Sequence, residues 1–203
     1  EERIQNAQTL YECVVKDAKE GTLWEVYEKL DGSSMSAFFN EGEFGVGSRN
    51  INSIEDSENT MWKIARKLDL ETKMSHSKLT AVQGELYGES IQSNRLGVKG
   101  QHLAIFDVWK DHKRIPRKYW PEWAIELSVP RRKDLEHIFY ENSTAEEIIN
   151  NISGIKSIIN RERLAEGVVV RHPSLATVIL PDGVGEKASF KVISNKYLLK
   201  HGE

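Results

Sequence analysis

The chain has 203 residues, of which 39% are hydrophobic and 29% charged, as in a globular protein that buries a core. Its formal net charge of −3 means that any binding to nucleic acid must depend on local basic patches. No apolar run approaches the ~20 residues of a membrane span, so no membrane partner is expected. The polar start of the chain does not resemble a signal peptide, and the single cysteine, Cys13, excludes an internal disulfide. We therefore expect a protein that is not secreted and works in the cytoplasm, or in the nucleus of a eukaryote.

Apolar residues at helical spacing predict three helices. The first begins at Ile4 and ends near Gly21, and the second covers Met61 to Leu68. The third follows the capping box Thr144-Ala145-Glu146-Glu147, and its isoleucines continue to Ile159.

Stretches typical of strands outnumber the helices. In chain order they are 23–30, 36–40, 44–48, 79–87, 102–109, 167–172, 175–180 and 188–193. Glu41-Gly42-Glu43 is a predicted hairpin turn, and the segment 110–132, with three of the five prolines, is the least regular. Strands that neighbour each other in this way indicate antiparallel sheets, so the predicted class is α+β. We expect one domain over residues 1–203.

The segment Lys29-Leu30-Asp31-Gly32-Ser33-Ser34 places a lysine at the end of a predicted strand, before a small acidic turn. A desolvated lysine amine can attack a phosphorus or carbonyl centre, and glycine lets a ligand approach the backbone. A surface turn explains this hexapeptide equally well when it is considered alone.

Four later strand-like stretches each carry a charged or aromatic residue that interrupts an apolar pattern. They contain Glu85, Phe106, Glu166 and Lys191. When each of these residues is considered alone, an exposed position on a strand face explains it. As an ordered set with Lys29, they suit a nucleotide, because lysines bind phosphates, carboxylates hold a hydrated metal ion, and an aromatic ring stacks on a base.

The ordered set resembles the covalent nucleotidyltransferase superfamily of ATP-dependent DNA ligases, RNA ligases and mRNA capping enzymes. Lys29 to Gly32 matches the superfamily signature Lys-x-Asp-Gly. Four longer strings are similar to the nick-sealing RNA ligases that carry an OB domain before the nucleotidyltransferase domain. They are Lys29–Met35, Gly47–Asn50, Gln83–Gln92 and Ser189–Lys200.

The resemblance implies an antiparallel-sheet adenylylation domain, like ATP-grasp ligases, that uses ATP with Mg²⁺ or Mn²⁺. Lys29 would become covalently linked to AMP, which passes to an RNA or DNA 5′-phosphate before a 3′-hydroxyl completes the joint. The implied catalytic residues are Lys29, Asp31, Glu85, Glu166 and Lys191. The implied cofactor-binding residues are Glu28, Lys29, Arg49, Glu85, Phe106, Val168, Lys187 and Lys191. The implied carboxylates that hold a metal ion through water are Asp31, Glu85 and Glu166.

Individual roles follow from the same resemblance. Phe106 would stack on adenine, and Lys191 would contact the α-phosphate. Arg49 would lie near the ribose and the nucleic-acid phosphate. The last motif departs from the related Lys-x-Lys pattern, because Ile193 occupies the second lysine position. Lys187 and Lys196 are both candidates to supply that charge.

The expected substrate is a nicked duplex with an RNA 3′-hydroxyl end, bound by a monomer. A DNA ligase, a capping guanylyltransferase and a binding module without catalysis are the alternatives. The basic residues between Arg114 and Lys133 could form an RNA-backbone surface, although a solvated loop is the simpler interpretation. Only 28 residues precede Lys29, too few for an OB domain. We therefore expect self-adenylylation but poor sealing of RNA ends.

Overall fold

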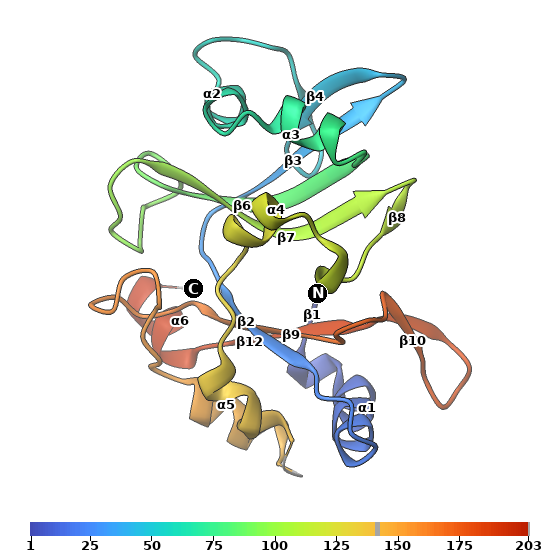
Figure 1. The fold of residues 1–203 in the computed structure, drawn as a ribbon. Coiled ribbons are helices and arrows are strands. Elements are labelled where there is room, and N and C mark those ends of the chain that lie inside the picture. The colour runs from blue at the N-terminus through green and yellow to red at the C-terminus, as the bar shows by residue number, and fades with distance from the viewer. Residues whose placement is uncertain (141–142, 203) are drawn as a thin grey trace. The chain divides into compact units, whose positions relative to one another are not determined.

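The computed structural model describes residues 1–140 and 143–202, which form two compact units (Figure 1). Unit 1 comprises Glu1–Leu30 and Pro130–Glu203, and unit 2 comprises Asp31–Val129. The strands of both units pair antiparallel, except that β1 runs parallel to β12. The predicted α+β class with antiparallel sheets is therefore confirmed.

Unit 1 is built on a four-stranded sheet with the order β1-β12-β9-β2. Its strands are β1 (Glu2–Arg3), β2 (Glu25–Lys29), β9 (Gly167–Arg171) and β12 (Ser189–Ile193), beside the hairpin of β10 (Thr177–Ile179) and β11 (Gly185–Lys187). Its helices are α1 (Gln8–Lys19), α5 (Ala145–Ile152) and α6 (Asn195–His201), with 3-10 segments η1 (Ile4–Asn6) and η3 (Lys133–Phe139).

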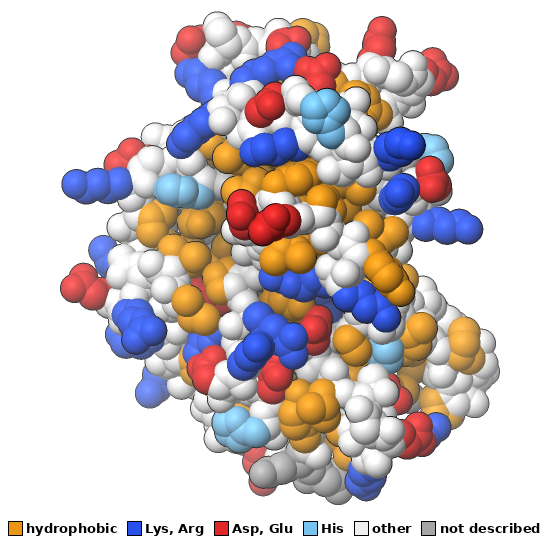
Figure 2. Space-filling model, viewed as in Figure 1, with side chains coloured by type: hydrophobic (Ala, Val, Ile, Leu, Met, Phe, Trp, Pro, Cys, Tyr) orange, Lys and Arg blue, Asp and Glu red, His pale blue; other side chains and the backbone are white. Residues whose placement is uncertain are grey.

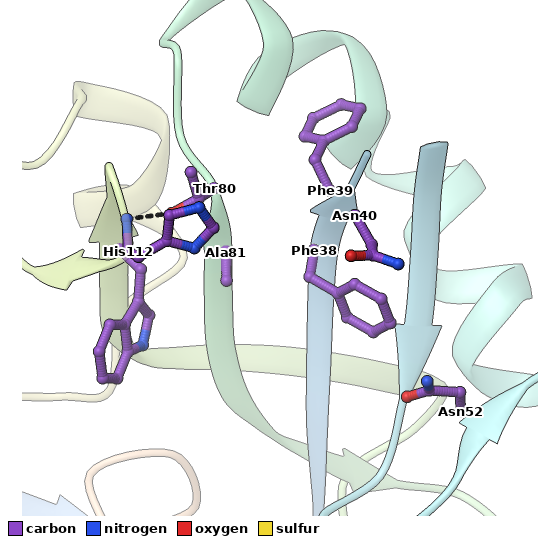
Figure 3. Close-up of a pocket in the computed structure, with 8 residues that line it drawn as sticks. Phe38, Phe39, Asn40, Asn52, Thr80, Ala81 and His112 are labelled. Atoms are coloured by element: carbon purple, nitrogen blue, oxygen red, sulfur yellow. Dashed lines mark hydrogen bonds between the residues drawn. The ribbon is translucent and has the colours of Figure 1, made fainter. Parts of the chain in front are cut away.

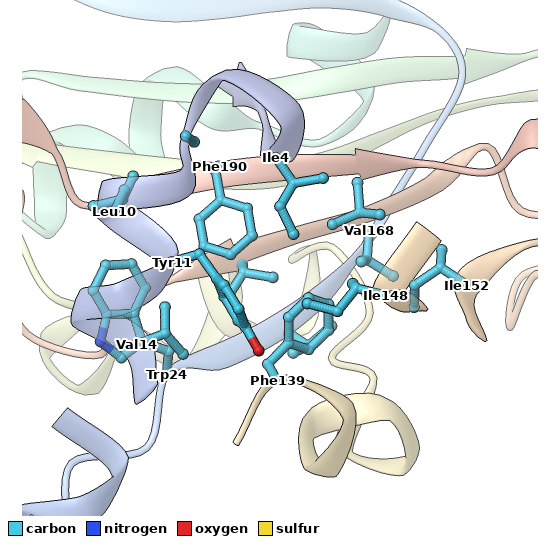
Figure 4. Packing of buried hydrophobic residues seen from close by; sticks show 14 of the residues in the cluster. Ile4, Leu10, Tyr11, Val14, Trp24, Phe139, Ile148, Ile152, Val168 and Phe190 are labelled. Carbon is cyan, nitrogen blue, oxygen red and sulfur yellow. The ribbon is translucent and has the colours of Figure 1, made fainter. Parts of the chain in front are cut away.

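The core of unit 1 lies between one face of this sheet and the helices α1 and α5 (Figure 4). Side chains alternate along each strand, so Val26, Val168, Val170, Phe190 and Val192 all enter the core. Figure 4 shows the rings of the core, and Tyr11 and Phe139 each meet Phe190 edge to face. The opposite face carries Lys29 and Lys191 beside the apolar side chains of Tyr27, Val169 and Ile193.

Unit 2 contains a six-stranded sheet with the order β5-β4-β3-β6-β7-β8. Its strands are β3 (Ser33–Asn40), β4 (Glu43–Gly47), β5 (Asn52–Ser53), β6 (Ala81–Gly88), β7 (Gln101–Lys110) and β8 (Lys113–Arg114). Its helices are α2 (Thr60–Lys67), α3 (Leu70–His76) and α4 (Glu122–Glu126), with the 3-10 segment η2 (Arg117–Tyr119). A second core buries Met35, Val82, Leu86, Ile105 and Val108 from the sheet together with side chains of the three α-helices.

The predicted hairpin turn at Glu41 and Gly42 is confirmed, because both residues have positive φ and Asn40 pairs with Glu43. The capping box is also confirmed, since Thr144 and Glu147 exchange hydrogen bonds at the start of α5. In the described residues, no helix has both the length and the apolar character required to span a membrane.

Two helix boundaries were predicted wrongly. Ile4–Asn6 forms a 3-10 turn, and α1 begins only at Gln8, because Ala7 provides no side-chain cap and instead donates its N–H to the Ile4 carbonyl. At the other boundary, α5 ends at Ile152 and does not reach Ile159. Ser153 is extended and Gly154 has a φ of +83°, a left-handed conformation that suits glycine and ends the helix.

Candidate active site

Lys29 and Glu166 form the central pair of the candidate site in unit 1. Lys29 is the last residue of β2 and pairs with Gly167 of β9, so Glu166, immediately before Gly167, lies beside it. The Lys29 Nζ atom is 2.7 Å from each carboxylate oxygen of Glu166. Both side chains are partly exposed, at 27% and 14%. The strand pairing thus places a candidate nucleophile in contact with a carboxylate that lies 137 residues later in the sequence.

Lys191 lies on the same face of the four-stranded sheet as Lys29. It pairs with Val169, which pairs in turn with Tyr27, two residues before Lys29. Neighbouring Phe190 and Val192 enter the core, so the lysine between them points to the opposite face. Two lysines on one open sheet face form a local cationic surface of the kind that phosphate groups require.

Arg3 and Ser189 extend this face, and the sequence analysis did not identify either. Arg3 of β1 is the register partner of Lys191. The Ser189 hydroxyl, two residues from Lys191, is buried and has no hydrogen-bond partner among the described residues. A buried hydroxyl without a partner is costly, which is consistent with a ligand oxygen binding nearby. The sequence concealed Arg3 because its neighbour Ile4 fitted the start of a predicted helix.

Glu28 and Val168 occupy the core face of the same strands. Val168 is fully buried in the hydrophobic core. The Glu28 carboxylate accepts hydrogen bonds from the Ser157 hydroxyl and from the Ile158 N–H at 2.7 Å. Burial raises the pKa of Glu28, while these hydrogen bonds and Arg132, 3.8 Å away, act in the opposite direction. The Glu28 side chain therefore anchors the loop before Glu166, and a contact of Glu28 or Val168 with a nucleotide stays a prediction.

Lys187 lies at the end of β11, outside the four-stranded sheet. Its Nζ atom is 3.1 Å from a carboxylate oxygen of Glu1, which also binds Arg171 at 2.7 Å. Burial alone would raise the pKa of Glu1, but Arg171 and Lys187 lower it to about 2. Lys196 is exposed at the start of α6. Lys187 and Lys196 therefore both lie outside β12. Neither replaces Ile193 as a second lysine of that strand on the face of Lys191.

In unit 2, the turn after Lys29 is held against β6. A side chain on Gly32 would place its Cβ 2.3 Å from the Leu86 carbonyl oxygen, so only glycine fits without moving the backbone. Asp31 lies 3.7 Å from the Arg95 guanidinium, which the sequence analysis did not identify. Glu85 of β6 pairs with Ser34 of β3. The geometry of this turn thus brings Asp31 and Glu85 to the same end of the β3–β6 pair.

Phe106 is the extra residue of a β-bulge in β7. Gln83 of β6 pairs with Asp107 and the next residue, Gly84, pairs with Ile105, so Phe106 is inserted between two ladder positions. Ile105 and Val108 both enter the core, which leaves Phe106 and Asp107 on the face that carries Glu85. Bulges redirect side chains in this way beside functional sites. The partly exposed ring is therefore available for stacking on a flat ligand.

Arg49 follows β4 in an exposed bend of unit 2. The basic residues between Arg114 and Lys133 are largely engaged in internal contacts. Arg131 binds Glu25 and Glu136 at 2.6 Å each, and Arg132 is nearly buried beside Asp134 at 2.8 Å. On the face shown in Figure 2, described basic and acidic side chains alternate and form no extended basic patch. These contacts favour a structural role for much of this segment.

The described residues contain no group of three or more His, Cys, Asp or Glu side chains arranged to hold a metal ion directly. Unit 1 supplies Glu166, and unit 2 supplies Asp31 and Glu85. Carboxylate oxygens are the ligands that Mg²⁺ and Mn²⁺ prefer, and Mg²⁺ usually keeps several waters. The chemistry of each carboxylate fits a hydrated cation, and a shared metal site of Asp31, Glu85 and Glu166 stays a prediction.

Comparisons with known proteins agree with this fold. A sequence model described as RNA ligase matches residues 22–193. The chain is similar to a Naegleria gruberi RNA ligase solved with PPi, with 32% identity and a TM-score of 0.75 over 99% of this chain and 56% of that one. An apo variant of that ligase gives a TM-score of 0.79 at 32% identity with the same coverage.

A further variant of the Naegleria ligase, solved with AMP and Mn, gives 32% identity and a TM-score of 0.75 with the same coverage. The chain therefore spans little more than half the length of these solved relatives. No match was found among curated proteins.

Proposed function

We infer, because this chain belongs to the RNA ligase family, that it carries the ATP-dependent adenylylation chemistry of an RNA ligase. The observation that carries the inference is the Lys29 amine, 2.7 Å from Glu166 on the sheet face that also presents Lys191. The Naegleria ligase solved with ATP and Mn and with AMP and Mn supports ATP and a divalent cation as cofactors. In this proposal Lys29 is the nucleophile.

The proposed reaction has three in-line phosphoryl steps. The Lys29 nitrogen attacks the α-phosphorus of ATP, a P–N bond forms, the bond to pyrophosphate breaks and the nitrogen loses a proton. A 5′-phosphate oxygen then attacks the same phosphorus, so the P–N bond breaks, the Lys29 nitrogen takes up a proton as it leaves, and an adenylylated 5′ end forms. Finally, a 3′-hydroxyl oxygen attacks the 5′-phosphorus, loses its proton and releases AMP. No oxidant or reductant is required.

The side chains of unit 1 act on the phosphate groups in this scheme. Lys191 and Arg3 lie on the face of Lys29 and neutralise charge on the α-phosphate and the phosphates beyond it. Glu166 orients the Lys29 amine through its two carboxylate oxygens. It is also the closest described group to accept the proton that the amine must lose before attack.

The side chains of unit 2 act on the nucleoside. Phe106, displaced by the bulge, stacks on adenine, and Glu85 on the same face binds the ribose hydroxyls or a metal-bound water. Asp31, Glu85 and Glu166 would hold a hydrated Mg²⁺ or Mn²⁺ through its waters. When bound, such an ion neutralises charge on the reacting phosphates.

We further propose a nicked duplex with an RNA 3′-hydroxyl as the substrate of the full reaction, bound by a monomer. Family membership supports a nucleic-acid substrate, and the strand type follows from the resemblance of the motifs. One nucleotidyltransferase domain would then comprise both compact units. The single cysteine, which leaves no internal disulfide, supports a role in a reducing compartment such as the cytoplasm, or the nucleus of a eukaryote.

The direct test is transfer of label from ATP to protein. Lys29→Ala should abolish the covalent adduct, whereas Lys63→Ala, a change at an exposed helical lysine, should leave the yield unchanged. An undiminished adduct in Lys29→Ala would identify another nucleophile. Labelling by GTP but not by ATP would instead indicate a capping enzyme. Joining of matched nicks that differ only in an RNA or DNA 3′ end then distinguishes an RNA ligase from a DNA ligase.

A further inference from the structure

A pocket of about 550 Å³ lies in unit 2 (Figure 3). Its lining residues contain no carboxylate, lysine or arginine. They are Phe38, Phe39, Asn40, Asn52, Thr80, Ala81, Trp109 and His112. Three aromatic side chains, two amides, a hydroxyl and an imidazole suit a flat heteroaromatic ring that also forms hydrogen bonds. The volume is within the usual range of about 300–1,000 Å³ for a small-ligand site.

The pocket and Glu85 share one face of the six-stranded sheet. Phe38 pairs with Ala81, four residues along the same two strands from the Ser34–Glu85 pair, and Ala81 pairs with Trp109. Four residues of strand correspond to about 13 Å. This distance equals about four nucleotides of a stacked strand, at 3.4 Å each. A nucleic-acid strand that passes Glu85 could therefore reach the pocket.

The Phe38 ring lies against β4 where that strand has no side chain. Gly45 is its register partner, and a Cβ on Gly45 would be 2.9 Å from the Phe38 ring. Gly45 therefore gives the ring room to lie along the sheet, and its remaining surface lines the pocket. Trp109 contributes from the adjacent strand β7. Phe38 and Trp109 are partly exposed and belong to neither hydrophobic core, whereas Phe39 packs against the core of unit 2.

The rim of the pocket contains a strained hairpin. Asp111 and His112 form the two-residue turn between β7 and β8, and both have positive φ, 50° and 59°. The second position of such a turn strongly favours glycine, as Gly42 provides in the β3–β4 hairpin. Here it is His112, whose N–H donates to the Thr80 hydroxyl at 3.3 Å. Strain retained at a pocket residue points to a functional reason for the side chain.

Lysines flank the same turn. Lys110 and Lys113 are both exposed and are direct cross-strand partners, an arrangement of like charges that weakens a sheet. A polyanion beside the turn would remove this repulsion. Glu41 and Glu43 follow Asn40 on the opposite hairpin. The charges therefore place a phosphate backbone beside β7–β8, with its base directed into the pocket.

We propose that this pocket binds one unpaired nucleobase of an RNA strand that leaves the paired region of the substrate about four nucleotides from the reacting end. The base stacks on Phe38 and Trp109, and Asn40, Asn52 and His112 bind its polar edge. The inference rests on the proposed function for the identity of the strand, although the pocket is formed by residues of unit 2 alone. It assigns unit 2 a role in holding substrate as well as nucleotide.

The test is binding of a labelled 12-nucleotide single-stranded RNA, followed by anisotropy, to wild type and Trp109→Leu. Base stacking on an aromatic side chain predicts about a 5- to 150-fold loss of affinity in the variant. Trp109→Phe should restore most of it, and the fully paired duplex of the same sequence should bind both proteins equally. Asn52→Ala should weaken the single strand in the same direction, whereas Asn150→Ala, at an exposed amide of α5, should not.

A series of single abasic sites identifies the bound base. In wild type, loss of one base near the fourth nucleotide should weaken binding, and the same substrate should show no further loss with Trp109→Leu. Three results would overturn the proposal: losses of affinity from the abasic site and from Trp109→Leu that add together, an equal loss of affinity for the duplex, or no loss of affinity at all. His112→Gly provides an independent check, since it should raise the melting temperature by relieving strain and still weaken RNA binding. A variant with unchanged RNA affinity would refute the role of His112.

The AMP adduct, measured on the same samples, separates this proposal from the proposed function. An adduct of normal yield with no effect of Trp109→Leu on RNA would overturn the pocket alone. Specific loss of RNA binding in a protein that never forms an adduct would overturn the adenylylation chemistry alone.

Discussion

Gly167 is the residue at which a single methyl group should damage both the fold of unit 1 and its chemistry. In Gly167→Ala, the new Cβ would lie 2.0 Å from the Val192 carbonyl oxygen and 3.0 Å from the Ile193 Cα. Both are backbone atoms of β12, so no side chain can rotate away. The two strands must separate until the first distance reaches at least 3.4 Å, an ordinary contact.

The free-energy cost of Gly167→Ala follows from the packing and the hydrogen bonds that this separation disturbs. Overpacking typically costs about 1–3 kcal/mol. The Ser194 N–H donates to the Glu166 carbonyl at 2.9 Å beside the clash, and one or two such hydrogen bonds would contribute about 0.5–1.5 kcal/mol each. The total is roughly 1.5–6 kcal/mol, which corresponds to a decrease in melting temperature of roughly 3–24 °C for a chain of this size. Gly167 also pairs with Lys29, so displacement should reduce the adduct yield.

Thermal unfolding and ATP labelling below the transition together test this reasoning. Gly185→Ala is the matched control, because this strand glycine has only the side-chain ends of Thr177 and Ile179 nearby, at 3.3 and 3.6 Å. It should shift the melting temperature far less. Equal stability of the two variants would show that the close approach of β9 to β12 does not constrain Gly167, and the reasoning would be refuted.

Three further changes test other parts of the account. Glu28→Ala should lower the free energy of unfolding in urea by about 2–4 kcal/mol, because the Ser157 hydroxyl and Ile158 N–H lose their acceptor. Glu28→Gln, which keeps an acceptor oxygen, should lower it less. An equal decrease in both variants would contradict the role of the buried hydrogen bonds. Thr144→Ala should lower it by about 0.5–2 kcal/mol by removing the capping box, and an unchanged urea midpoint would oppose this. Burial lowers the pKa of His172, so the unfolded chain binds the proton more readily than the folded one. The contribution of His172 to stability is therefore full above pH 6.5 and decreases as the pH falls below that value. His172→Gln should make the urea midpoint depend less on pH between pH 7.5 and 5.5, whereas an unchanged dependence would show that other groups cause it.

Local patterns in the sequence predicted much of the fold. The strand ending at Lys29, the Glu41-Gly42 turn and the Thr144 capping box each depend on a few neighbouring residues, and the structure confirms them. The end of α5 was missed because the isoleucine spacing continues past Ser153 and Gly154, where the backbone cannot remain helical. Helix α3 was missed because its seven residues bury only Leu70 and Met74.

In the candidate site, too, local motifs could be predicted from the sequence and long-range strand pairings could not. The order of the motifs pointed to Lys29, Glu166 and Lys191. Strand pairing places Lys29 and Lys191 on one face of the sheet, and Glu166 contacts Lys29 from the residue before β9. Periodicity could also have indicated that Val168 enters the core, since it alternates with Gly167 and Val169. Pairings between distant segments could not be predicted. Arg3 beside Lys191 and the bulge at Phe106 depend on registers that no local pattern specifies.

The most direct measurement of the central claim is the intact mass of the chain after incubation with ATP and Mg²⁺, followed by peptide mapping. The account predicts a gain of one adenylyl group, located on Lys29 and released by added pyrophosphate. No gain in mass, or an adduct on another residue, would contradict it.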